Sequence, residues 1–467
     1  MKKIFCFLLI TILALSLLAC SSKEETANPS AVFQVGFGRA DITPTSPMPL
    51  AGYGHDERRL HTNVLDNIYA TCIAITDETG ETILLFSTDL ISSVKHTEIR
   101  RQVSQATGVP QDHIILAATH THSSVAQNTA AAYGWLSLFY VKCVEAATAA
   151  MEDRANAEIY IGSGKTENMN FVRHYLMMDG SYAGDNFGSI EAGYKAHASE
   201  NDPQLQVIKF ARGEDTKDII MVNWQGHPCT TGGLEKTDLS ADYVGGTRSY
   251  IEYQTKDHFV FFLGASGNQN VKTYLPGEAG PPADPFAFGV QLGDVILETM
   301  ENMTKLENTK IRTTEYVFTG QVDHSNDHKL EDAKRVKELY DKTDRATGNK
   351  LAHELGITSV YEAGSIVSRA SRGETYDMTI YAYSVGDLAF VGAPYEMFAD
   401  HGVYIKENSP AEMTFIITCA NGVVCYIPTN LAYDYVCYES ATGIFARGTG
   451  DLVAEKYVEL LNAHRTN

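Results

Sequence analysis

The sequence has few basic residues for its length. Lys and Arg total 37 against 58 Asp and Glu in 467 residues, which gives a formal net charge of −21. Nucleic-acid-binding proteins usually present a basic face, so this balance argues against a nucleic-acid partner. Hydrophobic residues make up 44% of the chain and charged residues 20%, a composition that excludes a disordered or collagen-like protein.

After its first segment the chain also lacks long hydrophobic runs. None of them reaches the roughly 18 apolar residues that a membrane-spanning helix needs. The sequence has no internal repeat, and its eight cysteines include no CxxC pair, so we predict no repeat architecture and no particular disulfide. A chain of this length can bury a large core, in one large α/β domain or in two or three domains.

The first twenty residues have the order of a secretory signal. Lys2 and Lys3 precede an apolar stretch at 4–18, and Leu-Leu-Ala-Cys at 17–20 resembles a bacterial lipobox ending at Cys20. We therefore expect a signal peptide at 1–19, a lipidated tether at 20–32, and an exported protein anchored to a membrane of the cell envelope through lipid on Cys20. An ordinary signal peptide followed by a chance cysteine is the alternative.

The remainder alternates between apolar strands and helices, which predicts an α/β fold with a mixed sheet and helices on its faces. Two strands separated by a helix form a βαβ unit, whose strands are normally parallel. A charged helical segment at 327–356 is expected to be an exposed insertion. The strands are predicted at 81–89, 113–118, 218–224, 258–263, 376–391 and 413–419, and the helices at 93–108, 133–151, 285–303 and 450–463.

Polar residues follow several of these strands, where α/β sheets bind their ligands. The residues that follow the strands include Asp89, the pair His120 and His122, His227, the segment 264–270, and Glu396. Two imidazoles and one carboxylate with an open position are typical of catalytic zinc. Each residue also has an ordinary explanation: a buried histidine, a turn, a helix cap or a salt bridge. The prediction of one site depends on these strand ends meeting at one edge.

The same residues resemble the catalytic domain of the neutral (non-lysosomal) ceramidases. The resemblance runs from about residue 33 to 463 and is most specific in the Thr-His-Thr-His-Ser element around His120. The motifs that carry it, in chain order, are VGFGRADITP (35–44), GYG (52–54), STDL (87–90), ATHTHS (118–123), Asn170 with Arg173, HP (227–228) with SADY (240–243), the loop 264–270, GAPYE (392–396), YIPT (426–429) and YESA (438–441).

The resemblance implies a zinc site and a set of roles. It implies that His120, His227, Glu396 and Tyr426 bind Zn²⁺, and it suggests Arg173 and Gly267 as substrate-binding residues. It also implies a catalytic domain spanning 33–467 without the C-terminal immunoglobulin-like domain of ceramidases. At the position of a family serine in the 264–270 loop this sequence has Asn270, which leaves ceramide itself open as the substrate.

On this basis we expect four further roles. His122 would transfer a proton or bind the oxyanion, since imidazole titrates near neutrality. Asn270 would donate an amide N–H to the developing negative charge, and Tyr426 would ligate the metal and stabilise the same oxyanion. Asp89 would orient a histidine ligand, which is a common arrangement around metals.

The predicted function is hydrolysis of an amide bond in an N-acylated small molecule or lipid, ceramide-like or smaller, by metal-activated water. For a ceramide-like substrate this would be a reaction of sphingolipid metabolism. Two alternatives remain at this stage: a zinc esterase of the same fold, and an exported lipoprotein that binds a ligand without catalysis.

Overall fold

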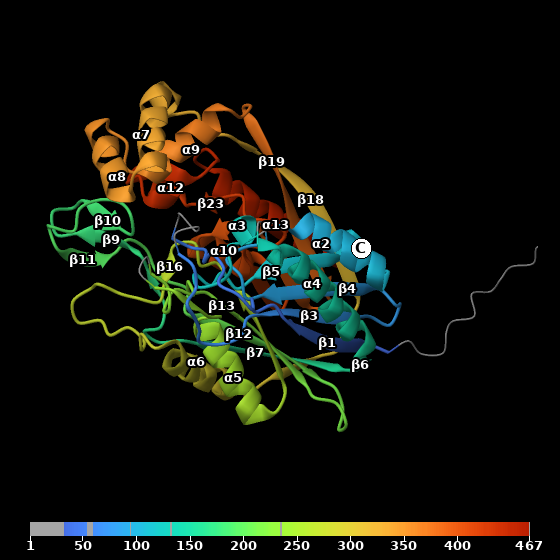
Figure 1. Ribbon diagram of the computed structural model, residues 1–467. Coiled ribbons are helices and arrows are strands. Elements are labelled where there is room, and N and C mark those ends of the chain that lie inside the picture. The colour runs from blue at the N-terminus through green and yellow to red at the C-terminus, as the bar shows by residue number, and fades with distance from the viewer. Residues whose placement is uncertain (1–31, 54–58, 94, 131–132, 234–235, 467) are drawn as a thin grey trace, which may run out of the picture. The chain divides into compact units, whose positions relative to one another are not determined.

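Three sheets, each with strands running in both directions, form the centre of the fold (Figure 1). The computed structural model describes residues 32–53, 59–93, 95–130, 133–233 and 236–466, and one unit spans Phe33–Asn467. The predicted signal peptide, Cys20 and all of the predicted tether except Val32 lie outside the described residues. No helix in the described ranges has both the length and the hydrophobicity needed to cross a bilayer.

Each of the three sheets contains one parallel pair of strands at one edge, and its other pairs are antiparallel. The parallel pairs are β4–β5, β13–β15 and β20–β22. In order across the sheets, the first has β5 (Ile114–Ala118), β4 (Thr82–Thr88), β3 (Tyr69–Thr76), β1 (Gln34–Asp41) and β6 (Ala155–Asn156); the second has β15 (His258–Leu263), β13 (Ile219–Trp224), β12 (Gln204–Ala211), β7 (Glu158–Lys165) and β17 (Thr304–Leu306); the third has β18 (Ile311–Gln321), β19 (Thr375–Val385), β20 (Leu388–Gly392) and β22 (Met413–Ile417).

Helices cover one face of each sheet, and the opposite faces of all three sheets share a single core. Two helices pack against each sheet. These are α2 (His96–Thr107) and α4 (Trp135–Glu152) on the first, α5 (Tyr243–Thr255) and α6 (Pro285–Met300) on the second, and α10 (Ala399–Asn408) and α13 (Thr449–Thr466) on the third.

Strand β4 illustrates why the sequence has uninterrupted apolar runs. Successive side chains of a strand point to opposite faces. Ile83 and Leu85 accordingly enter the core shared by the three sheets, while Leu84 and Phe86 enter the layer beneath α2 and α4. Both faces are buried, so every position of the strand is apolar or small.

Helices α7 (Leu330–Lys342), α8 (Arg345–Glu354) and α9 (Val360–Ala370) form a separate group with its own small core. They stand together at the upper left of Figure 1. The predicted helical insertion therefore forms, but one side of it is packed: Ala333, Val336 and Ala352 are buried.

Short elements complete the described part of the chain. They are α3 (Gln127–Ala130), α11 (Asn430–Asp434), α12 (Tyr438–Thr442), the 3₁₀ turns η2 (Gln111–His113) and η4 (Asp327–Lys329), the sheet β10 (Tyr182–Gly184), β9 (His174–Met177) and β11 (Tyr194–His197), and the strand pairs β14 (Asp238–Leu239) with β2 (Asn63–Val64), β16 (Gln269–Asn270) with β8 (Phe171–Val172), and β21 (Glu396–Met397) with β23 (Tyr426–Ile427).

The predicted α/β class, with mixed strand directions and helices on the sheet faces, is confirmed. The strands occupy three larger sheets where the sequence pattern indicated one. Strand β1 was not predicted, because Gly36 and Gly38 interrupt its apolar pattern. A Cβ atom at either glycine would lie 2.0 Å from a carbonyl oxygen of α4, so these glycines let the helix pack closely on the strand.

Two buried asparagines join the three sheets near the ends of the parallel strands. The side chain of Asn223, on β13, donates to Phe262 O at 2.9 Å and to Ile416 O at 2.8 Å. The side chain of Asn421, which follows β22, accepts from Leu116 N at 2.8 Å and donates to Ile114 O at 3.0 Å. Strand β22 is thereby tied to both other sheets, and the carboxyl ends of their parallel strands come together.

Candidate metal centre

Three of the predicted metal ligands meet at this junction, and each comes from a different sheet. His120 follows β5, His227 follows β13, and Glu396 follows β20 and begins β21. The Nε2 atoms of His120 and His227 lie 3.2 and 3.3 Å from the same oxygen, Oε2 of Glu396. All three side chains are buried.

The converging atoms have no other partner. Within the described residues, His120 Nε2, His227 Nε2 and Glu396 Oε2 are buried and form no hydrogen bond. Buried polar atoms are normally hydrogen-bonded, so three such atoms aimed at one point need an explanation. Imidazole nitrogens and a carboxylate oxygen are common zinc ligands, and the donor set fits a metal ion.

The opposite nitrogen of each imidazole is held by the backbone. His120 Nδ1 donates to Ile91 O at 2.7 Å, and His227 Nδ1 donates to Ser266 O at 2.9 Å. A hydrogen bond at Nδ1 fixes the ring and leaves the lone pair of Nε2 available for a metal. The orientation of both rings is therefore set before any metal binds.

His120 lies in a strained backbone conformation, with φ at +66°. Residues other than glycine rarely adopt this left-handed region, and where they do the site is often functional. In this conformation the chain turns away from the direction of β5. A hydrogen bond from His120 N to Leu90 O at 2.9 Å supports the turn. Cys419, whose Sγ lies 3.5 Å from His120 Nδ1, is also left-handed, with φ at +52°.

His122 belongs to the same group of imidazoles. Its ring centre lies 5.1 Å from that of His120 and 5.4 Å from that of His227, and the ligating atoms of all three histidines lie within 4.8 Å of one another. Neither of its ring nitrogens has a hydrogen-bond partner in the described residues. The geometry therefore allows His122 to be a third imidazole ligand as well as the predicted proton-transfer group.

The electrostatics favour a neutral His122 beside a charged Glu396. Burial, together with the neighbouring His120 and His227, lowers the pKa of His122 well below its usual value. Burial opposes ionisation of Glu396, but the two imidazoles on its carboxylate hold its pKa well below the usual range. The Glu396 carboxylate thus stays ionised, as a metal ligand must be.

Tyr426 lies beside Glu396 through the backbone. The two residues are partners in the parallel pair β21–β23. The Arg173 guanidinium lies over the Tyr426 ring, 5.6 Å from its centre. Burial and the charge of Glu396 raise the pKa of the Tyr426 phenol well above its usual value, so the phenol stays protonated while the site is metal-free.

Arg173 is held in a buried ion pair. Its Nε and Nη2 atoms donate to Glu439 Oε1 at 2.8 and 2.5 Å. The other oxygen of Glu439 lies 2.8 Å from His174 Nε2, and His174 Nδ1 lies 2.8 Å from the Tyr435 hydroxyl. The guanidinium predicted to bind substrate is thus committed to Glu439 and to the ring of Tyr426, and it positions that tyrosine.

This pair belongs to a second cluster of possible metal ligands, formed by His174, Cys437 and Glu439. Both ring nitrogens of His174 and both carboxylate oxygens of Glu439 already have protein partners. The cluster is therefore a satisfied polar network, and we do not assign it a metal.

Gly267 packs closely against the segment that carries Glu396. A Cβ atom at this position would lie 2.8 Å from Glu396 O and 2.9 Å from Met397 O. Its backbone N–H donates to Met397 O at 2.7 Å. Gly267 lets the loop after β15 lie directly against the segment that carries Glu396, so the structure gives it a positioning role, and the substrate-binding role stays a prediction.

Asp89 does not orient a histidine. Arg248 Nη2 donates to both of its oxygens, at 2.8 and 2.7 Å, and Tyr69 N donates to Oδ2 at 2.9 Å. A buried guanidinium needs a counter-charge, and Asp89 supplies it. Backbone carbonyls orient His120 and His227 in its place, so this predicted role was wrong.

Asn270 lies near the site with its side chain already engaged. Cys229 Sγ donates to Asn270 Oδ1 at 2.9 Å, and Asn270 Nδ2 donates to Asp185 Oδ2 at 3.3 Å. The amide N–H that was predicted to bind the oxyanion therefore points to Asp185 in this structure.

Asp242 is a supporting residue to which the sequence analysis gave no role. Its carboxylate accepts from Thr230 Oγ1 at 2.6 Å and from Thr231 N at 2.7 Å, which anchors the loop that carries His227. It also caps helix α5 by accepting from Tyr243 N. An aspartate directly before a helix is a recognisable N-cap signal and could have identified it.

Comparisons with known proteins found a match to a family model. A family model described as neutral/alkaline non-lysosomal ceramidase, N-terminal, matches residues 33–274, slightly more than half of the chain. Glu396 and Tyr426 lie beyond the matched residues.

Two solved structures share the fold. The neutral ceramidase from Pseudomonas aeruginosa is 17% identical with a TM-score of 0.68, and the match covers 93% of this chain and 75% of that one. A ceramidase complexed with C2 is 16% identical with a TM-score of 0.69 and the same coverage. At these identities the likeness concerns the fold.

Proposed function

The chain belongs to the neutral/alkaline non-lysosomal ceramidase family, and from that premise we propose that it is a zinc-dependent hydrolase of amide bonds. The substrate is an N-acylated compound, ceramide-like or smaller. Water adds OH to the acyl carbon and H to the nitrogen as the C–N bond breaks, so the products are a carboxylic acid and an amine.

One observation carries this proposal. Two imidazole nitrogens lie within 3.3 Å of one carboxylate oxygen, and all three atoms are buried and form no hydrogen bond in the described residues. His120, His227 and Glu396 would hold the metal, with Tyr426 beside Glu396. A zinc ion bound there would polarise the substrate carbonyl and lower the pKa of a bound water.

The chain's own residues supply the proton transfer and the charge stabilisation. His122 is neutral and has both ring nitrogens free of hydrogen bonds in the described residues, so it can accept a proton from water and pass it to the leaving amine. The protonated phenol of Tyr426 is the donor that we assign to the developing oxyanion. Arg173, fixed by Glu439, holds the ring of Tyr426 in place.

The test is the metal content of residues 21–467 for the wild type, His227→Ala and a matched control, His328→Ala. His328 is exposed and lies in the helical insertion. We expect about one zinc per chain in the wild type and the control, and none in His227→Ala. Paired amide and ester substrates then show which bond is cleaved. A wild type that takes up no metal on reconstitution would refute the hydrolase mechanism.

We also propose that the protein is exported and held at a membrane by lipid on Cys20. The support is the sequence alone: a basic start, an apolar stretch and a lipobox-like Leu-Leu-Ala-Cys. The substrate would then be met outside the cytoplasm.

A further inference from the structure

A cavity of about 390 Å³ opens beside the candidate metal centre. Its lining includes Gly52, Tyr53, Asp185, Arg345, Tyr361 and Tyr438. Among the described residues, none that lines it is Leu, Ile, Val, Met or Phe. Small-molecule sites of this volume are common and are usually lined by aliphatic and aromatic side chains; here the aromatic part is present as three tyrosines, and the described lining has no aliphatic part. This lining suits a short polar group better than a hydrocarbon chain.

Three contacts connect the cavity to predicted site residues. The ring of Tyr53 lies 5.2 Å from that of His122, and the ring of Tyr438 lies 5.8 Å from that of Tyr426. Asp185 is the acceptor for Asn270. A group bound in the cavity would therefore lie next to a bond cleaved at the metal centre.

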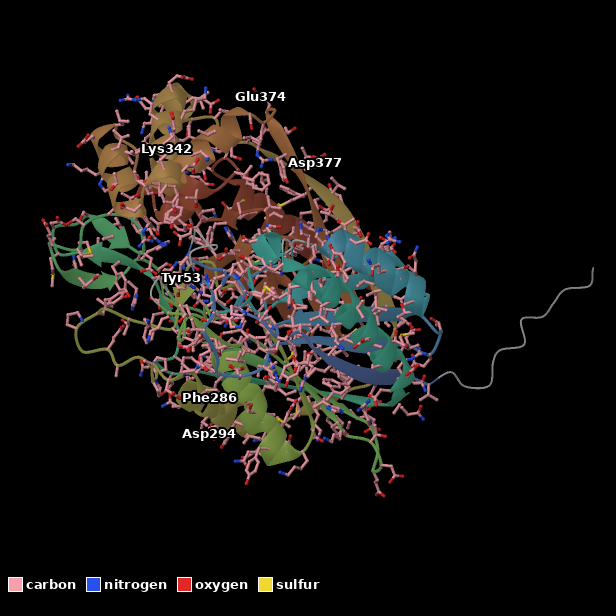
Figure 2. The ribbon with its side chains drawn as sticks, viewed as in Figure 1. Tyr53, Phe286, Asp294, Lys342, Glu374 and Asp377 are labelled. Carbon is pink, nitrogen blue, oxygen red and sulfur yellow. The ribbon has the colours of Figure 1, made fainter. Side chains whose placement is uncertain are left out.

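Helices α8 and α9 each contribute one residue to the lining of this cavity. Arg345 is the first residue of α8, and Tyr361 lies in the first turn of α9. The ring of Tyr361 lies 5.8 Å from that of Tyr438, so a row of aromatic rings runs from the insertion to Tyr426. In Figure 2, Tyr53 is labelled below the insertion helices, on which Lys342 is labelled.

Arg345 is the unexplained charge in this lining. Its side chain is half-buried, and within the described residues it forms no ion pair and no hydrogen bond. Asp185, the acid of the same lining, accepts from Asn270 and makes no ion pair with Arg345. By contrast, Arg335 of the same insertion pairs with Asp332 at 2.9 Å. A partly desolvated guanidinium without a counter-charge is costly, and a bound anion would remove that cost.

We propose that the substrate carries an anionic group beside the amide that is cleaved, and that Arg345 binds this anion. The compound is thus of the N-acyl amino acid class, or a phosphate-bearing equivalent. The inference rests on the proposed hydrolase function and narrows its substrate. Arginine is suited to the role because its planar guanidinium can form paired hydrogen bonds with a carboxylate or phosphate.

The experiment compares three amides that differ only in the group beside nitrogen: N-hexanoylglycine, the neutral N-hexanoylethanolamine, and the phosphate ester of that alcohol. We expect the zinc-loaded wild type to prefer an anionic compound. Arg345→Gln should lower kcat/KM for that compound by about 10- to 100-fold, the usual effect of losing a hydrogen bond to a charged group. It should lower kcat/KM for the neutral N-hexanoylethanolamine far less. The ratio of kcat/KM for the anionic compound to kcat/KM for the neutral one therefore falls.

Two further variants serve as controls. Arg345→Lys keeps the charge and should restore part of the preference, which separates loss of the anion contact from misfolding. Arg335→Gln removes an exposed, paired arginine from the same insertion and should leave the ratio as in the wild type. If Arg345→Gln lowers kcat/KM equally for anionic and neutral amides, or for neither, the anion site is refuted and the hydrolase function stands.

A different result would test the anion site when the hydrolase function fails. If the zinc-loaded wild type cleaves none of the amides, the hydrolase function fails. Calorimetric binding of N-hexanoylglycine then decides on the anion site alone. Binding that is about 10- to 100-fold weaker in Arg345→Gln supports it, and equal or absent binding overturns it.

Discussion

Gly267→Ala should weaken metal binding without replacing a metal ligand. The added Cβ would lie 2.8 Å from Glu396 O and 2.9 Å from Met397 O, whereas ordinary contact begins at 3.4 Å. Both oxygens belong to the backbone and cannot rotate away as a side chain would. The β21 segment or the Gly267 loop must therefore move by about 0.6 Å to relieve the contact.

A displacement of this size matters for a metal site. Functional groups must be held within about 0.5 Å of their working geometry, and Glu396 Oε2 lies only 3.2 and 3.3 Å from the two imidazole nitrogens. We expect the zinc affinity to fall by about 10- to 100-fold, the usual effect of disturbing a group that supports a ligand. The free energy of unfolding should fall by about 1–3 kcal/mol from overpacking.

Competition with a chelator of known zinc affinity measures the first effect, and urea unfolding of the metal-free protein measures the second. Gly364→Ala is the matched control, because a Cβ there meets nothing within 4 Å. It lies inside helix α9, so it should raise stability by up to about 1 kcal/mol and leave zinc affinity unchanged. A Gly267→Ala protein that binds zinc as tightly as the wild type would refute the positioning role.

Two further predictions concern Asp66 and Cys20. Burial raises the pKa of Asp66 to about 6, above the unfolded value of about 3.9. The contribution of Asp66 to stability is therefore complete below a pH of about 3.9 and is lost as the pH rises through about 6. Urea unfolding at pH 4 and pH 7 should show the wild type losing about 1–3 kcal/mol relative to Asp66→Asn; parallel pH dependences would contradict the assignment. Cys20→Ser should move the protein from the membrane to the soluble fraction and prevent fatty-acid labelling, and unchanged fractionation with no label on the wild type would argue against the lipid anchor.

Local patterns in the sequence were enough to locate the strands of the three parallel pairs, but not β3 and β12, the middle strands of the first and second sheets. Segments such as 113–118 and 258–263 are apolar at successive positions because both faces of the sheet are covered, and they correspond to β5 and β15. Strands β1 and β7 were missed because glycines break their pattern. The division into three sheets depends on which distant strands pair, and neither composition nor periodicity contains that information.

The site was partly predictable because the strands that lead to it could be located from the sequence. Polar residues at strand ends pointed to His120, His227 and Glu396, and the structure brings these three together. The role of Asp89 could not be judged, since its partner Arg248 is distant in sequence and lies on a helix that was not predicted. Arg345 was likewise hidden inside a charged segment that resembled ordinary solvent-exposed surface.

The origin of the metal donors in three separate sheets also affects how the protein matures. No two of His120, His227 and Glu396 share a sheet, so the donors meet only after all three sheets have docked. Such long-range contacts form late in folding. Zinc would therefore be captured by a nearly finished fold, unlike the small zinc domains in which metal binding drives folding. If the protein is exported as proposed, metal loading would follow both translocation and folding.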